Sequence, residues 1–233
     1  MLIYGTMHNI LCIFLLFCII STMNLFVLTL LPMSLVIFYV RKDIENRAHF
    51  LPVLFTGLFT GVLFLAYKLL FSTFFHVPQA NIFANFVYYF FSQEFFPIVI
   101  VYGLFFLFAR KDTLEDRFSF FFPAVVSFFS VFLPYIILST EKPYPAFLLF
   151  TKPLLLLAMF IILQVWLSKI PAVKKDVTSL LIIAAVILIT LILPAFTEAL
   201  WVVNKFPLLW IIPAVIEIGY AAFLLFLVNS GNN

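Results

Sequence analysis

Charged residues are scarce in this sequence. Only 10% of the 233 residues are Asp, Glu, Lys or Arg, whereas 66% are hydrophobic. A soluble domain carries about 25% charged residues and about 45–50% apolar ones. A compact soluble fold of this length has too large a surface relative to its core to bury so many hydrophobic residues. The composition therefore excludes soluble enzymes, disordered chains and nucleic-acid binders, and it predicts an all-α, polytopic membrane helical bundle.

Cysteine and histidine are also few. The two cysteines, Cys12 and Cys18, are six residues apart in an apolar run, so a helix places them on different faces. This spacing is not typical of a metal pair or a redox motif. The three histidines, His8, His49 and His76, fall near the start of the chain or in predicted loops. We therefore expect no zinc site and no other metal or cofactor.

Long apolar runs fill the chain instead. A spanning helix needs about 20 mostly apolar residues to cross about 30 Å of hydrocarbon. The candidate spans are 3–20, 24–40, 51–72, 83–109, 118–139, 144–167, 177–197 and 206–228. Residues 1–40 contain no charged residue and are compatible with one span or with two, and we expect a break at residues 21–24. Because all connections are short, we predict a single integral membrane domain over residues 1–233 with 7–8 transmembrane helices.

Basic residues gather in alternate predicted loops. Nine of the thirteen lie in three of them: Arg41, Lys42 and Arg47; Arg110, Lys111 and Arg117; Lys169, Lys174 and Lys175. The loops between them, 73–82, 140–143 and 198–205, are nearly neutral. The positive-inside rule places the basic loops in the cytoplasm, and the N- and C-termini then lie there too. The compact, Phe- and Ile-rich style favours a bacterial inner membrane.

Five ionisable side chains fall in or at the ends of the predicted spans. They are Lys68, Glu94, Lys152, Glu198 and Glu217, and Gln93 precedes one of them. At about 1.5 Å of rise per residue, each lies near the midplane or in the outer half of the membrane. Ionisable groups inside a membrane are costly and indicate function. We therefore predict that these six side chains form a polar intramembrane cluster. The structural alternative is that they neutralise each other in pairs, or that Lys68 and Glu198 reach toward the headgroups.

A family resemblance rests on the order of several motifs. Leu31-Pro32 is followed by Phe38-Tyr39-Val40-Arg41-Lys42-Asp43 and then by Gly57 in the next span. A later span carries Gln93-Glu94-Phe95-Phe96-Pro97, and the turn after it contains Asp112, Glu115 and Asp116. Over residues 24–228 this layout resembles the PrsW family of intramembrane proteases, related to the CAAX-prenyl protease and bacteriocin-immunity membrane group. Residues 1–23 are then an extra N-terminal helix.

The sequence departs from the motif residues of this family. The family has Glu-Glu-x-x-Lys where this chain has Gln93, Glu94 and Pro97. Its Glu-Asn position falls near Leu133-Pro134, and its histidine positions fall near Lys152 and Glu198. The resemblance implies that the glutamate pair activates water, while Asn and His orient it or stabilise an oxyanion. Glu94 is left as the candidate catalytic residue, and an ion-paired plug is expected in place of a polar pocket.

Three functions are compatible with these patterns. The first is a catalytically degenerate PrsW-like protein that binds or scaffolds a membrane-protein partner within the lipid bilayer. The second is a divergent but active intramembrane protease that uses Glu94 with help from Lys152. The third is a transporter or transporter subunit, which requires interrupted helices near the midplane and an internal repeat. We expect the first function, without enzymatic activity, because one carboxylate without partners is a weak catalyst.

Overall fold

The computed structural model describes residues 47–74, 81–108, 121–139, 146–173, 176–203 and 209–230. Its elements are α2 (Arg47–Phe74), α3 (Ile82–Tyr89), η2 (Phe90–Phe95), α4 (Phe96–Phe108), α6 (Phe121–Leu138), η3 (Phe147–Thr151), α7 (Lys152–Leu167), α8 (Ile170–Val173), α9 (Val177–Val203) and α10 (Ile211–Ser230). These ranges contain no strand, so the prediction of an all-α chain is confirmed for them. The predicted spans 3–20 and 24–40 lie outside the described residues, as does the extra helix expected for residues 1–23.

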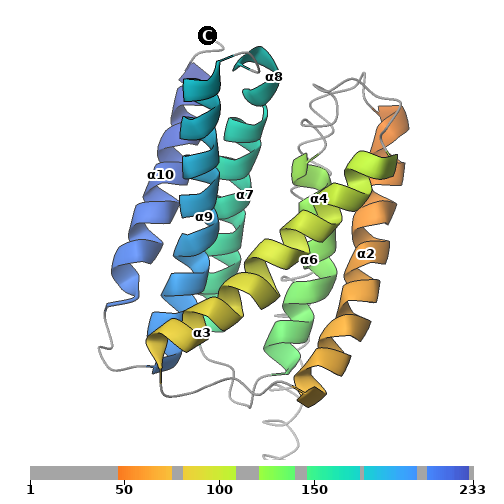
Figure 1. Ribbon diagram of the computed structural model, residues 1–233, viewed down its shortest axis with the longest axis vertical. Coiled ribbons are helices and arrows are strands. Elements are labelled where there is room, and N and C mark those ends of the chain that lie inside the picture. Colours follow the sequence, from red (N-terminus) through yellow and green to blue (C-terminus); the bar gives the residue numbers. More distant parts are fainter. Residues whose placement is uncertain are drawn as a thin grey trace, which may run out of the picture.

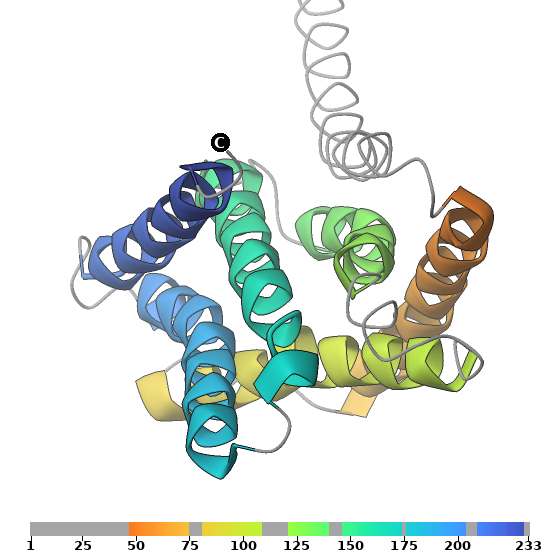
Figure 2. The ribbon, with the colours of Figure 1, turned by 90° about the horizontal axis from the view of Figure 1, so that it is seen from above.

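Elements α3, η2 and α4 form one tilted rod that crosses the bundle diagonally (Figure 1). At its beginning α3 contacts α9, and at its end α4 contacts α2 and α6. The view from above shows the rod running beside both groups of helices, with α7, α9 and α10 in one group and α2 and α6 in the other (Figure 2). Contacts between α6 and α7 join the groups. The middle of the rod, η2, packs against α9.

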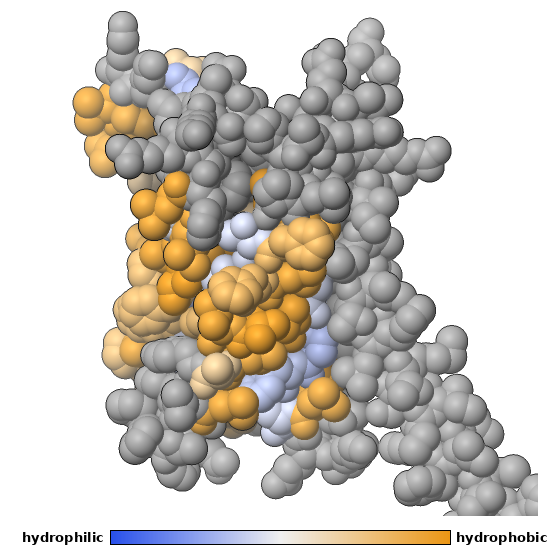
Figure 3. All heavy atoms as spheres, turned by 90° about the vertical axis from the view of Figure 1, so that its right-hand side faces the viewer, coloured by the Kyte–Doolittle hydropathy of each residue, from blue (hydrophilic) through white to orange (hydrophobic). Residues whose placement is uncertain are grey.

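Three helical stretches are long and apolar enough to cross a membrane: Ile82–Leu104, Phe147–Val173 and Val177–Val203. Shorter apolar helices run over Val53–Ala66, Pro123–Leu138 and Ile211–Leu227. Large apolar side chains are exposed along α2, α9 and α10. The coloured part of the face on the α2 and α4 side is largely hydrophobic, with a paler band across it (Figure 3). These features indicate a membrane protein, whereas the number of transmembrane helices stays a prediction.

The prediction that a loop begins at residue 198 is wrong. Helix α9 continues through Glu198 and ends at Val203, so this glutamate lies inside a helix and not at its end. The prediction was wrong because it took a charged residue as the boundary of an apolar run. Glu198 is 4% exposed and forms an ion pair with Lys152. Since its charge is neutralised locally, the helix can continue past it.

Phenylalanine fills both the core and the outer surface of α2. Phe128 and Phe132 are fully buried on α6. The ring of Phe64 on α2 meets both of them edge-on, with centroid distances of 5.5 Å and 5.2 Å. Phe55 and Phe59 on the same helix are 64% and 66% exposed. Phenylalanine therefore serves as packing bulk on the inner face of α2 and as an apolar coat on the outer face.

Glycine lets α2 approach α6 closely. A Cβ atom on Gly57 would lie 2.4 Å from the Ala124 carbonyl oxygen and 2.7 Å from the Ser127 Cβ. One turn later, a Cβ atom on Gly61 would lie 3.0 Å from the Val131 Cβ. Small residues four positions apart allow two helix backbones to pack together within a membrane. The contact between α2 and α6 therefore depends on the absence of side chains at these two positions.

Helix α9 begins with a side-chain cap. The backbone N–H of Thr178 donates to Asp176 Oδ1 at 3.1 Å, and the Ser179 hydroxyl donates to Asp176 Oδ2. Such a cap satisfies an amide group that the first turn of a helix leaves without a partner. The hydrogen bond from Ser179 lowers the pKa of the Asp176 carboxyl below its ordinary value. The predicted start of this span, at residue 177, agrees with the cap.

Candidate functional site: a polar cluster among the helices

The tilted rod widens into a π-helical turn at its centre. This turn, η2, carries Gln93 and Glu94, both buried, and Pro97 follows it within α4. Proline has no amide hydrogen, and its ring clashes with the carbonyl group four residues earlier. A regular α-helix is therefore disturbed at this point. Turns of the π type are rare inside helices and are frequent at functional sites.

The same combination occurs at Lys152. The π-helical turn η3 ends at Thr151, and Pro153 is the second residue of α7. The amide of Lys152 donates to the carbonyl of Phe147, five residues earlier. In both helices the buried polar residues therefore lie between a π-helical turn and a proline, or within that turn.

Lys152, Gln93 and Glu198 form a polar network, here called the Lys152 network. Lys152 Nζ donates to Gln93 Oε1 and to Glu198 Oε2, and it forms an ion pair with Glu198. The three side chains are 3%, 6% and 4% exposed, in the order named. A buried charge is tolerated when it is paired and hydrogen-bonded. The network joins η2, α7 and α9.

Glu94 lies near the Lys152 network without a hydrogen bond to it. Its side chain is fully buried, and neither carboxyl oxygen has a hydrogen-bond partner among the described residues. The charge of Lys152 attracts a carboxylate at this position, and the charge of Glu198 repels it. An isolated carboxylate in apolar surroundings is too costly to persist. Glu94 must therefore hold a proton or accept a cation.

Lys68 approaches the network from α2. Its Nζ atom donates to the Tyr88 hydroxyl at 3.1 Å and lies 4.7 Å from the centroid of the Tyr88 ring. The charges of Lys152 and Glu198 also act on it. Lys68 is 6% exposed, so its ammonium group is enclosed by the bundle. The alternative that Lys68 reaches outward toward the headgroups is not what this geometry shows.

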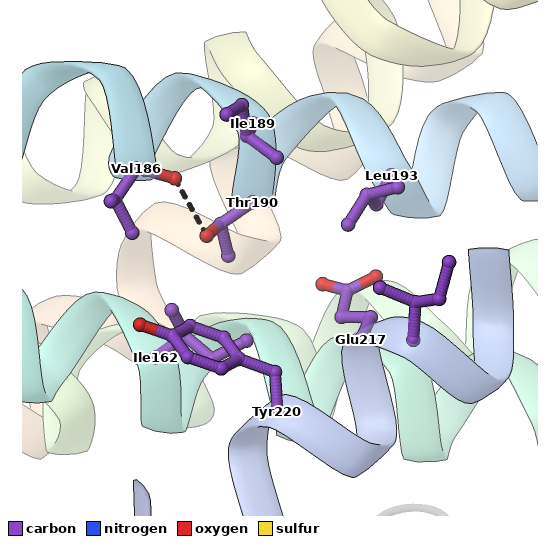
Figure 4. Close-up of a pocket in the computed structure, with 8 residues that line it drawn as sticks. Ile162, Val186, Ile189, Thr190, Leu193, Glu217 and Tyr220 are labelled. Carbon is purple, nitrogen blue, oxygen red and sulfur yellow. Dashed lines mark hydrogen bonds between the residues drawn. The ribbon is translucent and has the colours of Figure 1, made fainter.

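Glu217 faces a cavity of about 210 Å³ between α7, α9 and α10 (Figure 4). The side chain is fully buried, and neither carboxyl oxygen has a hydrogen-bond partner within the described ranges. The charge of a second buried acid, Glu94, acts on the Glu217 carboxyl group. Hydrogen bonds join three of the six predicted cluster residues, Gln93, Lys152 and Glu198. Electrostatic interactions link the remaining three, Lys68, Glu94 and Glu217, to the network or to each other.

The described residues offer limited chemistry around this network. They contain no group of three or more His, Cys, Asp or Glu side chains that could hold a metal ion. The buried hydroxyls of Ser127 and Ser130 donate to carbonyls of their own helix, at 2.7 Å and 2.8 Å. The acids, amines and amide of the cluster can pair charges and can bind protons or cations.

The residues singled out by the PrsW resemblance meet in part at this network. The resemblance predicts that Gln93 and Glu94 occupy the glutamate pair of the family motif, and that Lys152 and Glu198 fall near its histidine positions. The structure brings three of these four into hydrogen-bond contact. The acidic turn residues Asp112, Glu115 and Asp116 lie outside the described residues. The roles that the resemblance implies stay predictions.

Comparisons with known proteins identify no relative. No family model, no curated protein and no solved structure matches the chain. The geometry of the cluster and the sequence patterns are therefore the observations that bear on function.

Sequence reasoning missed two aromatic hydroxyl groups near the ionisable residues. Tyr88 accepts a hydrogen bond from Lys68 across helices. Tyr220 accepts one from Trp166 Nε1 at 3.0 Å and lines the same cavity as Glu217. Residues three apart share a helix face, so the spacing from Glu217 to Tyr220 is a signal that the sequence contained. No such spacing connects Tyr88 to Lys68, because they belong to different helices.

Proposed function

We propose that this chain is a catalytically degenerate PrsW-like integral membrane protein that binds or scaffolds a membrane-protein partner. The Lys152 network carries the proposal. Where the family resemblance implies two water-activating carboxylates, one position holds an amide, Gln93, and that amide is bonded to Lys152. An amide cannot act as a general base. The ammonium group of Lys152 is at the same time paired with Glu198. The members of the network therefore bond to one another.

A structural role explains the same geometry. Buried ion pairs give modest net stability, and they fix the register of the elements that they join. The Lys152 network joins three helices in this way. The proposal includes the finer topology: 7–8 transmembrane helices in a bacterial inner membrane, with both termini in the cytoplasm, as the alternating basic loops favour.

The test is a tagged purification from native membranes in mild detergent, with the wild type and the Glu94→Gln variant in parallel. We expect both forms to retain the same membrane protein in stoichiometric amount, because partner binding does not need the Glu94 carboxyl. Mass spectrometry identifies the partner and quantifies the ratio. A different membrane polypeptide that accumulates only on Glu94→Gln, and that the wild type cuts, would show that the site is an active protease.

A second candidate, a transporter or transporter subunit, is favoured by the two π-helical turns. Many transporters bind their substrate or coupling ion where membrane helices are interrupted near the midplane. Here η2 and η3 interrupt two helices beside the buried polar groups. Glu94 and Glu217 interact electrostatically and are carboxyl groups that can bind protons or cations. The absence of an internal repeat in the sequence counts against this candidate.

Reconstitution into vesicles that enclose a pH-sensitive dye distinguishes the two candidates. Under an imposed potential, we expect the wild type to show the same proton entry as empty vesicles, because the Lys152 network is closed by its own contacts. The Glu94→Gln variant is the matched control. Proton entry that is faster with the wild type and returns to the empty-vesicle rate with Glu94→Gln would support the transporter instead.

A further inference from the structure

The cavity beside Glu217 has walls that are almost entirely apolar. Ile162 on α7, Val186 and Leu193 on α9, and Ile216 on α10 contribute to it. Its volume of about 210 Å³ is larger than an engineered apolar protein cavity of roughly 150 Å³ that binds benzene. The space is therefore large enough for a compact apolar ligand.

The polar groups of the cavity wall are satisfied, with one exception. The Thr190 hydroxyl donates to the carbonyl oxygen of Val186 at 2.8 Å, and the Tyr220 hydroxyl accepts from Trp166 Nε1. Both oxygens of Glu217 have no hydrogen-bond partner in the part of the chain that the structure describes. Figure 4 shows this carboxyl group projecting from α10 toward α9. The Glu217 carboxyl group therefore needs a hydrogen-bond donor or a cation, and a bound ligand can supply either.

The charge environment favours a cation at this position. The titratable group that acts on Glu217 is a second acid, Glu94. An ionised Glu217 carboxylate attracts a cation strongly, because electrostatic interactions are strong in surroundings of low polarity. Ionisable residues within membrane segments generally pair with an opposite charge. Glu217 has no such hydrogen-bonded partner among the described side chains.

The cavity borders the outer surface of the bundle. Two of its lining residues, Ile189 on α9 and Ile216 on α10, are 55% and 58% exposed. In a membrane protein an exposed apolar edge of this kind faces lipid. A ligand that dissolves in the bilayer can therefore reach Glu217 from the side, between α9 and α10.

We propose that the cavity between α7, α9 and α10 binds a small lipophilic amine in its cationic form, with the ammonium group on the Glu217 carboxylate and the apolar body against Ile162 and Val186. The ammonium supplies the positive charge and the donors that Glu217 lacks. The compact body replaces empty space with apolar contacts. This site does not depend on the scaffold role and would exist in a transporter or a protease as well.

The test measures binding of 1-adamantylamine to the full-length protein in detergent at neutral pH, by equilibrium dialysis. We expect Glu217→Gln to bind the amine at least about 30-fold more weakly than the wild type, the loss typical of removing one partner of a buried charge pair. Thr197→Val is the matched control. Thr197 lies on the same helix as Thr190, is buried outside the cavity wall, and donates its hydroxyl to the carbonyl oxygen of Leu193. The affinity of this variant for the amine is expected to stay within about threefold of the wild type.

Two further measurements keep the result decisive. The neutral isostere 1-methyladamantane is expected to bind much more weakly than the amine. Val186→Phe, which fills the cavity and keeps the carboxyl group, is expected to lose amine binding even if Glu217→Gln fails to fold. Equal binding of the amine by the wild type and by either cavity variant would overturn the proposal. Equal binding of the amine and its neutral isostere would overturn it as well.

Discussion

Replacing Lys152 with methionine is expected to lower the free energy of unfolding by about 3–5 kcal/mol, the cost typical of breaking one side of a buried ion pair. The substitution keeps most of the side-chain volume and removes the ammonium group. Glu198, 4% exposed, is then left without its cation, and Gln93 Oε1 without its donor. Unfolding in mild detergent by titration with a denaturing detergent, followed by tryptophan fluorescence, measures the change.

Lys169→Met is the matched control for this experiment. Lys169 lies just past the end of α7 and is exposed, with its Nζ atom 4.4 Å from the centroid of the Trp166 ring. Loss of an exposed cation–π contact costs about 0.5–1 kcal/mol. A Lys152→Met variant that is no less stable than Lys169→Met would show that the Lys152 network contributes little to holding the helices together.

A bulky side chain at position 57 is expected to separate α2 from α6. In Gly57→Leu the new Cβ atom lies only 2.4 Å from the carbonyl oxygen of Ala124. This oxygen belongs to the backbone of α6, so it cannot move aside as the end of a flexible side chain can. Overpacked cores lose about 1–3 kcal/mol, and we expect the upper end of this range. The same detergent unfolding experiment measures the loss.

Gly219→Leu provides the control for Gly57→Leu. A Cβ atom on Gly219 meets nothing within 4 Å, and leucine has a higher helix propensity than glycine. This variant is therefore expected to be as stable as the wild type or slightly more stable. If both leucine variants unfolded at the same concentration of denaturing detergent, the close contact between α2 and α6 would not explain the lower stability of Gly57→Leu.

The positions of the helices were largely predictable from the sequence. The predicted span 83–109 corresponds to the rod from Ile82 to Phe108, and the predicted span 118–139 corresponds to α6, Phe121–Leu138. Apolar runs and charged turns carry this information because a membrane helix must satisfy its own backbone and present apolar side chains to lipid. The boundary at Glu198 failed because a paired charge does not end a helix.

The residues of the candidate site were also visible in the sequence, and their arrangement was not. Ionisable residues stand out in apolar spans, so all five were identified from their positions in the sequence. Which of them meet depends on the angle of the rod and on the π-helical turns at η2 and η3. Hydrophobic patterning does not encode these features. The sequence contained a partial hint, since Pro97 and Pro153 follow the two turns.

The glycine contact shows a different limit of sequence reasoning. Six glycines in 233 residues suggest few close helix contacts. Two of the six, Gly57 and Gly61, are nevertheless four apart on one face of α2 and pack against α6. The spacing of small residues was therefore more informative than their number.

We propose that the Lys152 network stabilises the bundle and performs no chemistry. The most direct test is the Lys152→Met/Glu198→Leu double variant, compared with each single variant by detergent unfolding and by retention of the purified partner. We predict that the double variant regains at least about 2 kcal/mol relative to Lys152→Met, since no unpaired charge remains, and that it keeps the partner. Additive losses, or a folded double variant without the partner, would contradict the claim.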